Sequence, residues 1–446
     1  MPRQAAAYQD NSETKIPILL IEIEMMKKIT LLSLLALSTS VCAQSTTIHC
    51  GKLFDATSGR ILDNQYITVT NDTITAVESR SNSNVDINLA DKTCLPGLID
   101  LHVHLSDELS PRSYLHRYQW SESDFALNAA NNAYKDMLAG FTTVRDLGDQ
   151  YLETIALRNA ISRGVADGPR IFAAGKNLAS TGGHGDPTNG VPFVSSGDPG
   201  PREGVINSPE DARKAVRQAY KNGSNVIKIT ATGGVLSLAT NGQNAQFTPA
   251  ELDAIIETAT DYGMHVAAHA HGIDGMLRAV NAGVKTIEHG TYMNDAIINA
   301  MKENDAWYIP TISAGQFVAE KAKIDGYFPE VVRGKAATIG PLILETFRKA
   351  HKAGVNIAFG TDTGVSAHGN NAQEFGFMVE GGMTPAEALQ AATIKAADVL
   401  DQEQTLGQVA PGFFADIIAV DNNPLDDIST MNQVEFVMKG GKVYSP

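Results

Sequence analysis

The sequence predicts an α/β protein that folds as a (β/α)8 TIM barrel with a small β-sandwich domain built from both chain ends. Residues 44–94 contain short strands rich in Val, Ile and Thr, separated by turns. From residue 95 to 403, apolar strands alternate with amphipathic helices, which is typical of βα units and a parallel sheet. Strand texture returns over residues 404–446, so we expect the two terminal segments to form one domain.

Residues 1–43 are predicted to be a targeting segment that does not belong to the fold. Lys27 and Lys28 precede a run of apolar or small residues, and the run ends in small residues at Ala43. This order is typical of a secretory signal peptide cleaved after Ala43. A methionine just before the lysines would give the signal a normal start, so we interpret residues 1–24 as an artefactual upstream extension. The alternative is a short amphipathic helix of a cytoplasmic protein.

The expected location is therefore the periplasm or the cell exterior. A lipoprotein modified at Cys42 is disfavoured, because Val41 is bulkier than the small residue that normally precedes a lipidated cysteine. After cleavage, Cys50 and Cys94 would remain. In an oxidising compartment these two residues could form a disulfide, or they could both be buried thiols.

Eight strand candidates follow one another through the barrel region. They are residues 97–104, 142–146, 170–174, 225–230, 265–270, 286–289, 307–312 and 356–361. Two of the helices between them begin at capping boxes with proline at the first helical position, at residues 248–251 and 384–387. The Gly- and Pro-rich stretch 181–204 is too long for a plain connector, which makes it a candidate lid or binding loop. In such a barrel the chemistry lies at the carboxyl ends of the strands.

Length and composition allow this architecture and exclude several functions. Of the 446 residues, 43% are hydrophobic and 19% are charged, so a sizeable core can be buried. The formal net charge of −15 argues against a protein that binds nucleic-acid backbones. No apolar run reaches the roughly 20 residues that a membrane-spanning helix needs. Three cysteines are too few for a disulfide scaffold or a cysteine-built zinc site, so the 11 histidines are the metal-capable residues to follow.

The first barrel strand carries two histidines on one face. His102 and His104 alternate with Leu101, Val103 and Leu105, and the apolar face of a barrel strand packs against the helices. Both imidazoles are therefore predicted to point inward at the carboxyl end of the strand, where they could bind one metal ion. Taken alone, the pair is more often structural.

An inward lysine follows in the fourth strand. Ile227 and Ile229 take the outer face, which places Lys228 inside, where a charged amine is costly unless it is paired, neutralised or modified. A neutral amine can take up CO₂ to form a carbamate, whose two oxygens could bridge two metal ions. The alternative is a buried pair of this lysine with a carboxylate.

Three further ligand-type residues end later strands. His269, His289 and Asp362 close the fifth, sixth and eighth strands. Any one of them would normally be a satisfied polar group. Together with the histidines and the lysine of the first and fourth strands, they make six ligand-type residues at one end of the barrel, which indicates a metal site.

These motifs resemble the amidohydrolase superfamily. The resemblance rests on residues 95–104 (LPGLIDLHVH), the inward lysine, the later histidines and residues 360–362 (GTD). Residues 228–234 (KITATGG), 268–272 (AHAHG), 287–291 (IEHGT) and 368–371 (HGNN) resemble its prolidase-like, or Xaa-Pro dipeptidase-like, branch. Members of this branch are dipeptidases and carboxypeptidases that cut the amide before a C-terminal amino acid, and ochratoxin-type amidases belong to it as well.

The resemblance implies a role for each ligand-type residue. His102, His104 and Asp362 would hold one divalent ion, most often zinc, and His269 and His289 would hold a second. Carboxylated Lys228 and a hydroxide would bridge the two ions. Asp362 would be the catalytic residue that takes the hydroxide proton and passes it to the leaving amine.

Substrate contacts are expected from residues near these ligands. His271 lies two residues beyond His269 on the same face, so either could be the ligand; we favour His269, with His271 toward the substrate. His184, Tyr292 and His368 follow strands or lie in the candidate lid, and each could bind a substrate carboxylate or an oxyanion. Each could equally be a loop residue with local partners.

Arg145 and Asp146, at the end of the second strand, are expected to form a structural ion pair rather than a substrate clamp. The predicted function is that of a binuclear metal-dependent amidohydrolase acting on dipeptides or N-acyl amino acids, and the resemblance also implies a homo-oligomer. One alternative is the opening of a cyclic amide, as in imidazolonepropionase-like relatives, although those generally use one metal and lack the bridging lysine. The other is a non-catalytic periplasmic binding protein on the same scaffold.

Overall fold

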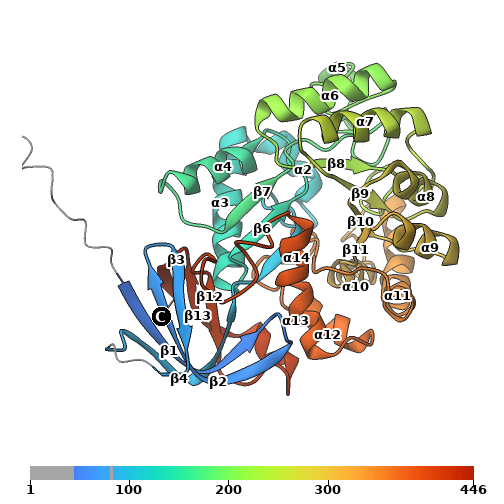
Figure 1. Cartoon of the computed structure of the whole chain (residues 1–446). Helices are drawn as coiled ribbons and strands as arrows, with labels where there is room; N and C mark the ends of the chain where they lie inside the picture. Colours follow the sequence, from blue (N-terminus) through green and yellow to red (C-terminus); the bar gives the residue numbers. More distant parts are fainter. Residues whose placement is uncertain (1–44, 81–83, 446) are drawn as a thin grey trace, which may run out of the picture. The chain divides into compact units, whose positions relative to one another are not determined.

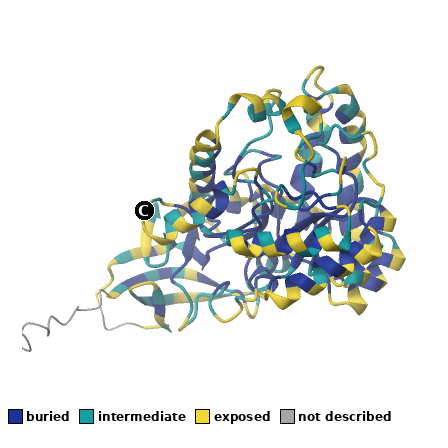
Figure 2. Cartoon of the chain, turned by 90° about the horizontal axis from the view of Figure 1, so that it is seen from above, coloured by how far each residue is buried: buried dark blue, intermediate teal, exposed yellow. Residues whose placement is uncertain are grey.

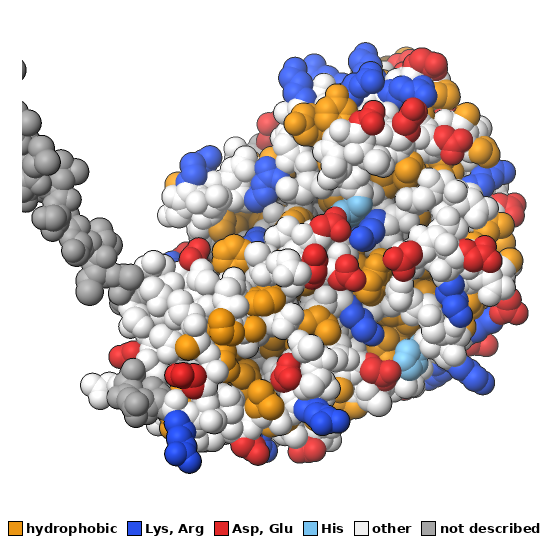
Figure 3. Space-filling model, in the orientation of Figure 1, with side chains coloured by type: hydrophobic (Ala, Val, Ile, Leu, Met, Phe, Trp, Pro, Cys, Tyr) orange, Lys and Arg blue, Asp and Glu red, His pale blue; other side chains and the backbone are white. Residues whose placement is uncertain are grey.

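The computed structural model describes residues 45–80 and 84–445 of the chain. The predicted signal peptide lies outside the described residues. No helix in these ranges is both long enough and apolar enough to cross a membrane. On the face shown in Figure 3, acidic, basic and apolar side chains are interspersed.

Both chain ends contribute to one seven-stranded sheet, in the order β14-β13-β12-β4-β1-β2-β3 (Figure 1). Its strands are β1 (Ser45–Asp55), β2 (Arg60–Thr70), β3 (Thr73–Glu78), β4 (Ile87–Pro96), β12 (Ile417–Val420), β13 (Val434–Lys439) and β14 (Lys442–Ser445). The N-terminal and C-terminal parts meet where β4 pairs antiparallel with β12. The two terminal segments therefore share one sheet.

The seven-stranded sheet has its own apolar core. Ile48, Ile67 and Ile417 are completely buried in a cluster that the sheet strands and the segment before β12 supply. In the same cluster, Cys50 of β1 and Cys94 of β4 form a disulfide. The two alternatives left open by the sequence are thus resolved in favour of the paired form. The bond joins neighbouring parallel strands.

Two parallel sheets form the rest of the strand structure. One has the order β5-β6-β7 and the other β11-β10-β9-β8. Their strands are β5 (Ile99–Val103), β6 (Thr143–Asp146), β7 (Arg170–Ala173), β8 (Ile227–Thr230), β9 (Val266–Ala270), β10 (Thr286–His289) and β11 (Trp307–Ile309). The predicted eighth strand, 356–361, is not a regular strand; single parallel bridges join Ile357 to Tyr308 and Thr363 to Val103. A further bridge joins Leu178 to Ile229.

Helices follow most of these strands. They are α2 (Ser113–Gln119), α3 (Glu122–Leu138), α4 (Glu153–Ser162), α5 (Phe193–Ser196), α6 (Pro209–Asn222), α7 (Pro249–Asp261), α8 (Ile273–Ala282), α9 (Asp295–Glu303), α10 (Ile312–Lys321), α11 (Glu330–Lys352), α12 (Gln373–Glu380), α13 (Pro385–Ala391) and α14 (Ile394–Val399). A 3-10 helix, η1 (Ile428–Asn432), precedes β13. Figure 2 shows buried residues on the strands and exposed residues on the outer sides of the helices.

Both predicted capping boxes are confirmed, at the starts of α7 and α13. Thr248 accepts a hydrogen bond from the backbone N–H of Glu251, and the Glu251 carboxylate accepts one from the backbone N–H of Thr248. Thr384 and Glu387 do the same. These caps satisfy N–H groups that a helix start leaves without partners, so the local sequence fixes where each helix begins.

Candidate active site

A cavity of about 380 Å³ lies beside the ends of the parallel strands. Eight of the predicted site residues line it: His102, His104, His184, Lys228, His269, His271, His289 and Asp362. Apolar side chains supply another part of its surface, among them Phe125, Val235, Leu236, Val318 and Ile343. The cavity therefore joins a cluster of ionisable groups to an apolar wall.

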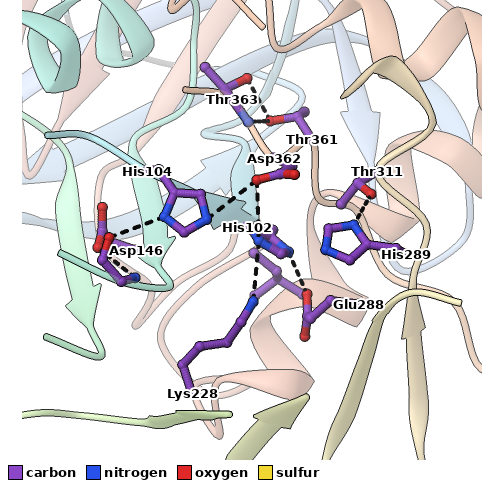
Figure 4. Close-up of polar contacts among 12 residues, drawn as sticks. His102, His104, Asp146, Lys228, Glu288, His289, Thr311, Thr361, Asp362 and Thr363 are labelled. Atoms are coloured by element: carbon purple, nitrogen blue, oxygen red, sulfur yellow. Dashed lines mark hydrogen bonds and ion pairs between the residues drawn. The ribbon is translucent and has the colours of Figure 1, made fainter. Parts of the chain in front are cut away.

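One group of potential ligands comes from the end of β5 and the segment after residue 361. Oδ1 of Asp362 lies 3.4 Å from Nε2 of His102 and 3.4 Å from Nε2 of His104 (Figure 4). The ligand atoms of the three residues lie within 4.8 Å of one another. Backbone hydrogen bonding aligns the two segments, because Asp362 N–H donates to the His102 carbonyl at 2.7 Å.

The hydrogen bonds of His102 and of His104, which directly follows β5, fix the tautomers of both rings. Nδ1 of His102 donates to Oε2 of Glu288 at 2.8 Å, and Nδ1 of His104 donates to the carbonyl of Gly148 at 3.1 Å. A carboxylate or a carbonyl can only accept, so Nδ1 carries the proton in each ring. The bare Nε2 of both rings then faces Asp362, which is the arrangement that partners behind a metal ligand commonly enforce.

A second group contains three imidazoles, His269, His271 and His289. Nδ1 of His289 lies 2.7 Å from the hydroxyl of Thr311, which itself donates to the Pro310 carbonyl and so must accept from the ring. His289 therefore presents an unprotonated Nε2. Because His271 joins the group, geometry alone does not choose between His269 and His271.

The Lys228 amine lies beside the first ligand group. Nζ is 3.4 Å from Nε2 of His102, and the residue is only 4% exposed. Within the described part of the chain, no carboxylate oxygen lies within 4.0 Å of Nζ. Among these residues, Lys228 therefore does not form the buried ion pair with a carboxylate that was the alternative hypothesis. Burial lowers the pKa of Lys228 to about 8, against the opposing charges of Glu288 and Asp362. The neutral amine is thus a larger fraction of the population near neutral pH than it is for an exposed lysine.

Burial also keeps the histidines neutral. It holds the pKa of His102, His269 and His289 well below the usual range and lowers the pKa of His104 to about 4. Burial raises the pKa of Asp362 to about 7, while the Lys228 charge acts in the opposite direction. Neutral imidazoles with a carboxylate are the donor set that divalent metal ions such as zinc prefer, so the residues fit a metal site.

Three residues of the site have left-handed backbone conformations. The φ angles are 69° for His289, 52° for Thr311 and 58° for Asp362. For residues with a Cβ this conformation costs about 1–2 kcal/mol each, and such strain is concentrated at functional sites. At His289 the turn ends β10 directly before Gly290, which also has a positive φ. The fold therefore holds these side chains in place at a local energetic cost.

Comparison with known proteins identifies the family. A profile of the amidohydrolase family matches residues 93–444, most of the chain. This chain belongs to the amidohydrolase family. The predicted family is thus confirmed, and the protein is a hydrolase that acts on amide bonds. The family is metal-dependent, in agreement with the two ligand groups.

This chain is also similar to individual amidohydrolases in sequence and in structure. A crystal structure of a Xaa-Pro dipeptidase with methionine bound in its active site has a TM-score of 0.88 and 49% identity, covering 90% of this chain and 100% of that one. A prolidase complexed with N-methylphosphonate-L-proline has a TM-score of 0.81 and 29% identity over 90% and 100% of the two chains. Ochratoxinase from Aspergillus niger is 36% identical over 369 residues, which is 78% of this chain and 75% of the relative.

A buried ion pair that was not expected from the sequence supports the first ligand group of this amidohydrolase. Nη2 of Arg145 donates to Oε1 of Glu288 at 3.0 Å, and both side chains are completely buried. The expected Arg145–Asp146 pair is wrong: the Asp146 carboxylate accepts from the backbone N–H of Leu105 instead, at 2.8 Å. Glu288 thus connects the arginine to His102. The sequence signal for this ion pair was Glu288, a charged residue within a buried strand and next to His289.

Two predicted substrate residues do not line the cavity. Nδ1 of His368 donates to Asp136 at 2.9 Å, and its Nε2 lies 3.2 Å from the His104 carbonyl. Both nitrogens of this ring face acceptors, so His368 has the contacts of a structural residue behind the first ligand group. Tyr292 is partly buried and packs against the main apolar core. Its backbone N–H donates to the His271 carbonyl at 3.1 Å.

His184 reaches the cavity from the loop after β7. Its ring stacks on that of His269, with 4.3 Å between the ring centroids. Its Nδ1 is buried and has no hydrogen-bond partner among the residues that the structure describes. An unsatisfied buried nitrogen beside a cavity is a candidate contact for a bound substrate.

Proposed function

We propose that this amidohydrolase uses two divalent cations, most often zinc, to cleave the amide bond before a C-terminal amino acid. Dipeptides and N-acyl amino acids, including ochratoxin-type amides, are the proposed substrates. The observation that carries the proposal is the buried Lys228 amine, which lies beside the first ligand group and has no carboxylate partner among the residues that the structure describes. The names of the similar proteins, a Xaa-Pro dipeptidase, a prolidase and ochratoxinase, support the substrate class.

The proposed assignment of ligands follows the two groups. His102, His104 and Asp362 would hold one cation, and His269 and His289 the other. Lys228 would join them after it reacts with CO₂: the amine nitrogen bonds to the carbon, an N–H proton leaves to solvent, and the carbamate carries the negative charge. Cations held in this way would make a water molecule acidic and would polarise the substrate carbonyl.

Proton transfer is assigned to Asp362. Its carboxylate lines the cavity, and burial brings its pKa to about 7 in the metal-free chain. The carboxylate would accept the proton of the attacking water and return it to the nitrogen of the leaving amino acid, so that the amine departs neutral.

Substrate binding is assigned to His184 and His271. Both rings line the cavity, and the Thr291 hydroxyl lies 2.7 Å from Nδ1 of His271, so Nε2 is the nitrogen of that ring assigned to the substrate. These rings would hold the substrate carboxylate or the oxyanion that forms at the attacked carbonyl. The apolar wall would receive an apolar side chain of the substrate.

The strand bridges support a closed barrel as the scaffold of this site. We infer that the segment 356–363 completes the ring between β11 and β5, and that the bridge from Leu178 to Ile229 joins β7 to β8. The seven-stranded sheet would then be the predicted sandwich domain beside it. In such a barrel the ligand residues would share the carboxyl end of the strands, where barrel enzymes carry their chemistry.

Export from the cytoplasm is the proposed location. The Cys50–Cys94 disulfide supports it, because disulfides persist mainly in oxidising compartments. Detection of the processed protein, beginning at residue 44, in the periplasmic or culture fraction would test this location.

A dipeptide and acyl-amino-acid panel tests the proposed reaction. The zinc-loaded enzyme is assayed while the C-terminal residue is varied, with the chelator-treated enzyme as control. Release of the C-terminal amino acid, lost on chelation and restored by zinc, is the expected result. Bound metal without hydrolysis of any substrate would instead favour the non-catalytic binding protein, and ring opening of cyclic amides alone would favour an imidazolonepropionase-like reaction.

A further inference from the structure

The segment 233–239 forms part of the cavity wall without any regular secondary structure of its own. It follows β8, and its residues Val235 and Leu236 line the cavity. A loop wall of this kind keeps its shape only if contacts from outside hold it, because its backbone makes no helix or sheet ladder.

This segment also contacts two histidines of the site. The carbonyl of Gly233 lies 3.3 Å from Nε2 of His269. Gly234 packs so closely on His184 that a Cβ added at this glycine would lie 2.3 Å from the imidazole ring. A shift of the segment would therefore change both the apolar wall and the surroundings of two imidazoles.

Lys335 of α11 holds the segment through three hydrogen bonds. Its ammonium group donates to the carbonyls of Gly234, Ser237 and Ala239 at 3.0, 2.8 and 2.6 Å. Three donors are all that an ammonium group has, so its capacity is fully used. In the described part of the chain it has no carboxylate within 4.0 Å, and it does not line the cavity. The half-buried charge is thus directed only at this loop backbone.

A second helix holds the same segment. The hydroxyl of Tyr114, on α2, donates to the carbonyl of Leu236 at 2.9 Å. Two helices that are distant in sequence therefore fix four carbonyls of one short loop. The lysine contributes three of these bonds and a charge, and hydrogen bonds from charged donors are about twice as strong as neutral ones.

We propose that Lys335 is a positioning residue that holds the segment 233–239 in its place as the apolar wall and thereby sets the affinity for substrate. It touches neither the ligand groups nor the cavity, so its contacts act through the loop, and its positive charge adds to the effect of burial in lowering the pKa of His271 and His184. The kinetic part of this inference rests on the proposed amide hydrolysis. The structural part, that the loop loses its order without the lysine, does not.

Lys335→Met tests the inference, because methionine keeps most of the apolar stem and removes all three donors. Lys349→Met is the matched control on the same helix, since its amine pairs with the exposed Asp295. With the zinc-loaded enzyme, we expect KM to rise about 10-fold or more in Lys335→Met, with kcat changed less than about 3-fold. Tyr114→Phe should raise KM in the same direction by a smaller factor.

Limited proteolysis of the same full-length proteins provides a readout without catalysis. The segment 231–247 contains no Lys or Arg but has leucines and Phe247, so chymotrypsin is the suitable protease. Cleavage there, located by mass spectrometry, should be about 10-fold faster in Lys335→Met than in wild type and unchanged in Lys349→Met. Melting curves confirm that the compared proteins are folded.

Unchanged cleavage in a folded Lys335→Met would overturn the inference, because a change in KM alone would then come from the lost charge and not from the loop. A fall in kcat without faster cleavage would also overturn it, because the lysine would then act on the chemistry and not on the loop. If the wild-type enzyme hydrolyses no substrate of the panel, the proposed function fails, and the cleavage rates alone still decide whether Lys335 orders the loop.

Discussion

The seven-stranded sheet and the histidine cavity differ in what they bury. The sheet buries aliphatic side chains such as Ile48 and Ile417, with the Cys50–Cys94 disulfide among them. The cavity gathers imidazoles, a lysine and a carboxylate, and three of its residues have strained backbones. Burial of apolar surface stabilises a fold, whereas burial of ionisable groups and backbone strain destabilise it. Stability and chemistry thus depend on different parts of this amidohydrolase.

The largest expected effect is the loss of activity on Asp362→Asn. The amide cannot accept the water proton, so kcat should fall about 1,000-fold, within the range of general acid–base catalysis. Because the substitution removes a buried carboxylate, the free energy of unfolding of the metal-free protein should not fall. Steady-state kinetics and urea unfolding measure the two quantities. Asp401→Asn, at an exposed carboxylate, is the control, and near-normal kcat in Asp362→Asn would contradict the assigned role.

The second prediction concerns the seven-stranded sheet, where a substitution should lower stability and leave activity almost unchanged. Replacing both Cys50 and Cys94 with alanine opens a link between residues 44 positions apart. The free energy of unfolding should fall by about 4 kcal/mol on the chain-entropy estimate, while kcat/KM at 25 °C stays within about 2-fold of wild type. Denaturant unfolding and the amide assay are compared on the same preparation. A parallel loss of activity in the folded protein would show that the two regions are not separable.

A matched threonine pair sharpens the description of the cavity itself. Thr311 and Thr291 are both buried, and their hydroxyls contact Nδ1 of His289 and His271, respectively. If His289 is a ligand and His271 is not, Thr311→Val should weaken zinc binding about 10-fold, as loss of a partner behind a metal ligand does. Thr291→Val should raise KM and leave zinc affinity unchanged. Chelator competition measures the affinity.

Equal losses of zinc affinity in the two valine variants would place His271 among the ligands and would contradict the choice of His269. Loss in Thr291→Val alone would make His271 a ligand and would remove His289 from the ligand set. Both variants keep the branched shape of threonine, so a difference between them reports the hydroxyl and not the packing.

The features that could be predicted from the sequence are those with local causes. Alternation along one strand placed His102 and His104 on one face, and four adjacent residues defined each capping box. What could not be predicted depends on contacts across the fold. Arg145 has a carboxylate beside it in the sequence but pairs with Glu288, 143 residues away. His368 lies within a family-like motif, yet its partner is Asp136 on α3.

The spacing of residues along a strand also cannot identify a metal ligand when two candidate residues lie on the same face of the strand. His269 and His271 are two residues apart on β9 and its exit, so alternation brings both into the same group of potential ligands. The disulfide is similar: β1 and β4 pair in parallel with Cys50 opposite Leu89 and Cys94 opposite Leu53, across a register shift, and this irregular pairing is a property of the whole sheet. The chemical groups of a site can thus be predicted from the sequence more readily than their partners.

The smallest expected effect concerns Lys439, an ionisable group that the sheet does bury in part. Burial lowers its pKa to about 8, and the nearby Arg170 charge lowers it further, against Asp416 and Asp167. Between pH 8 and the usual value of 10.5, the unfolded chain therefore binds more protons than the folded one. The stability of the wild type should consequently rise with pH through this window, and the destabilising effect of the charge should be complete below pH 8.

Lys439→Met should therefore raise the free energy of unfolding below pH 8, and the gain should shrink as the pH approaches 10.5. Lys442→Met on the next strand is the matched control with the opposite sign, because a hydrogen bond to Asp167 raises the pKa of Lys442. Its contribution is present below the usual pKa of a lysine and is lost above it. Urea unfolding of the wild type and the two variants at several pH values tests the expected direction of the change in stability for each substitution. If Lys439→Met changed stability equally at all pH values, its effect would come from packing, and the sheet would contain no charge that opposes its apolar core.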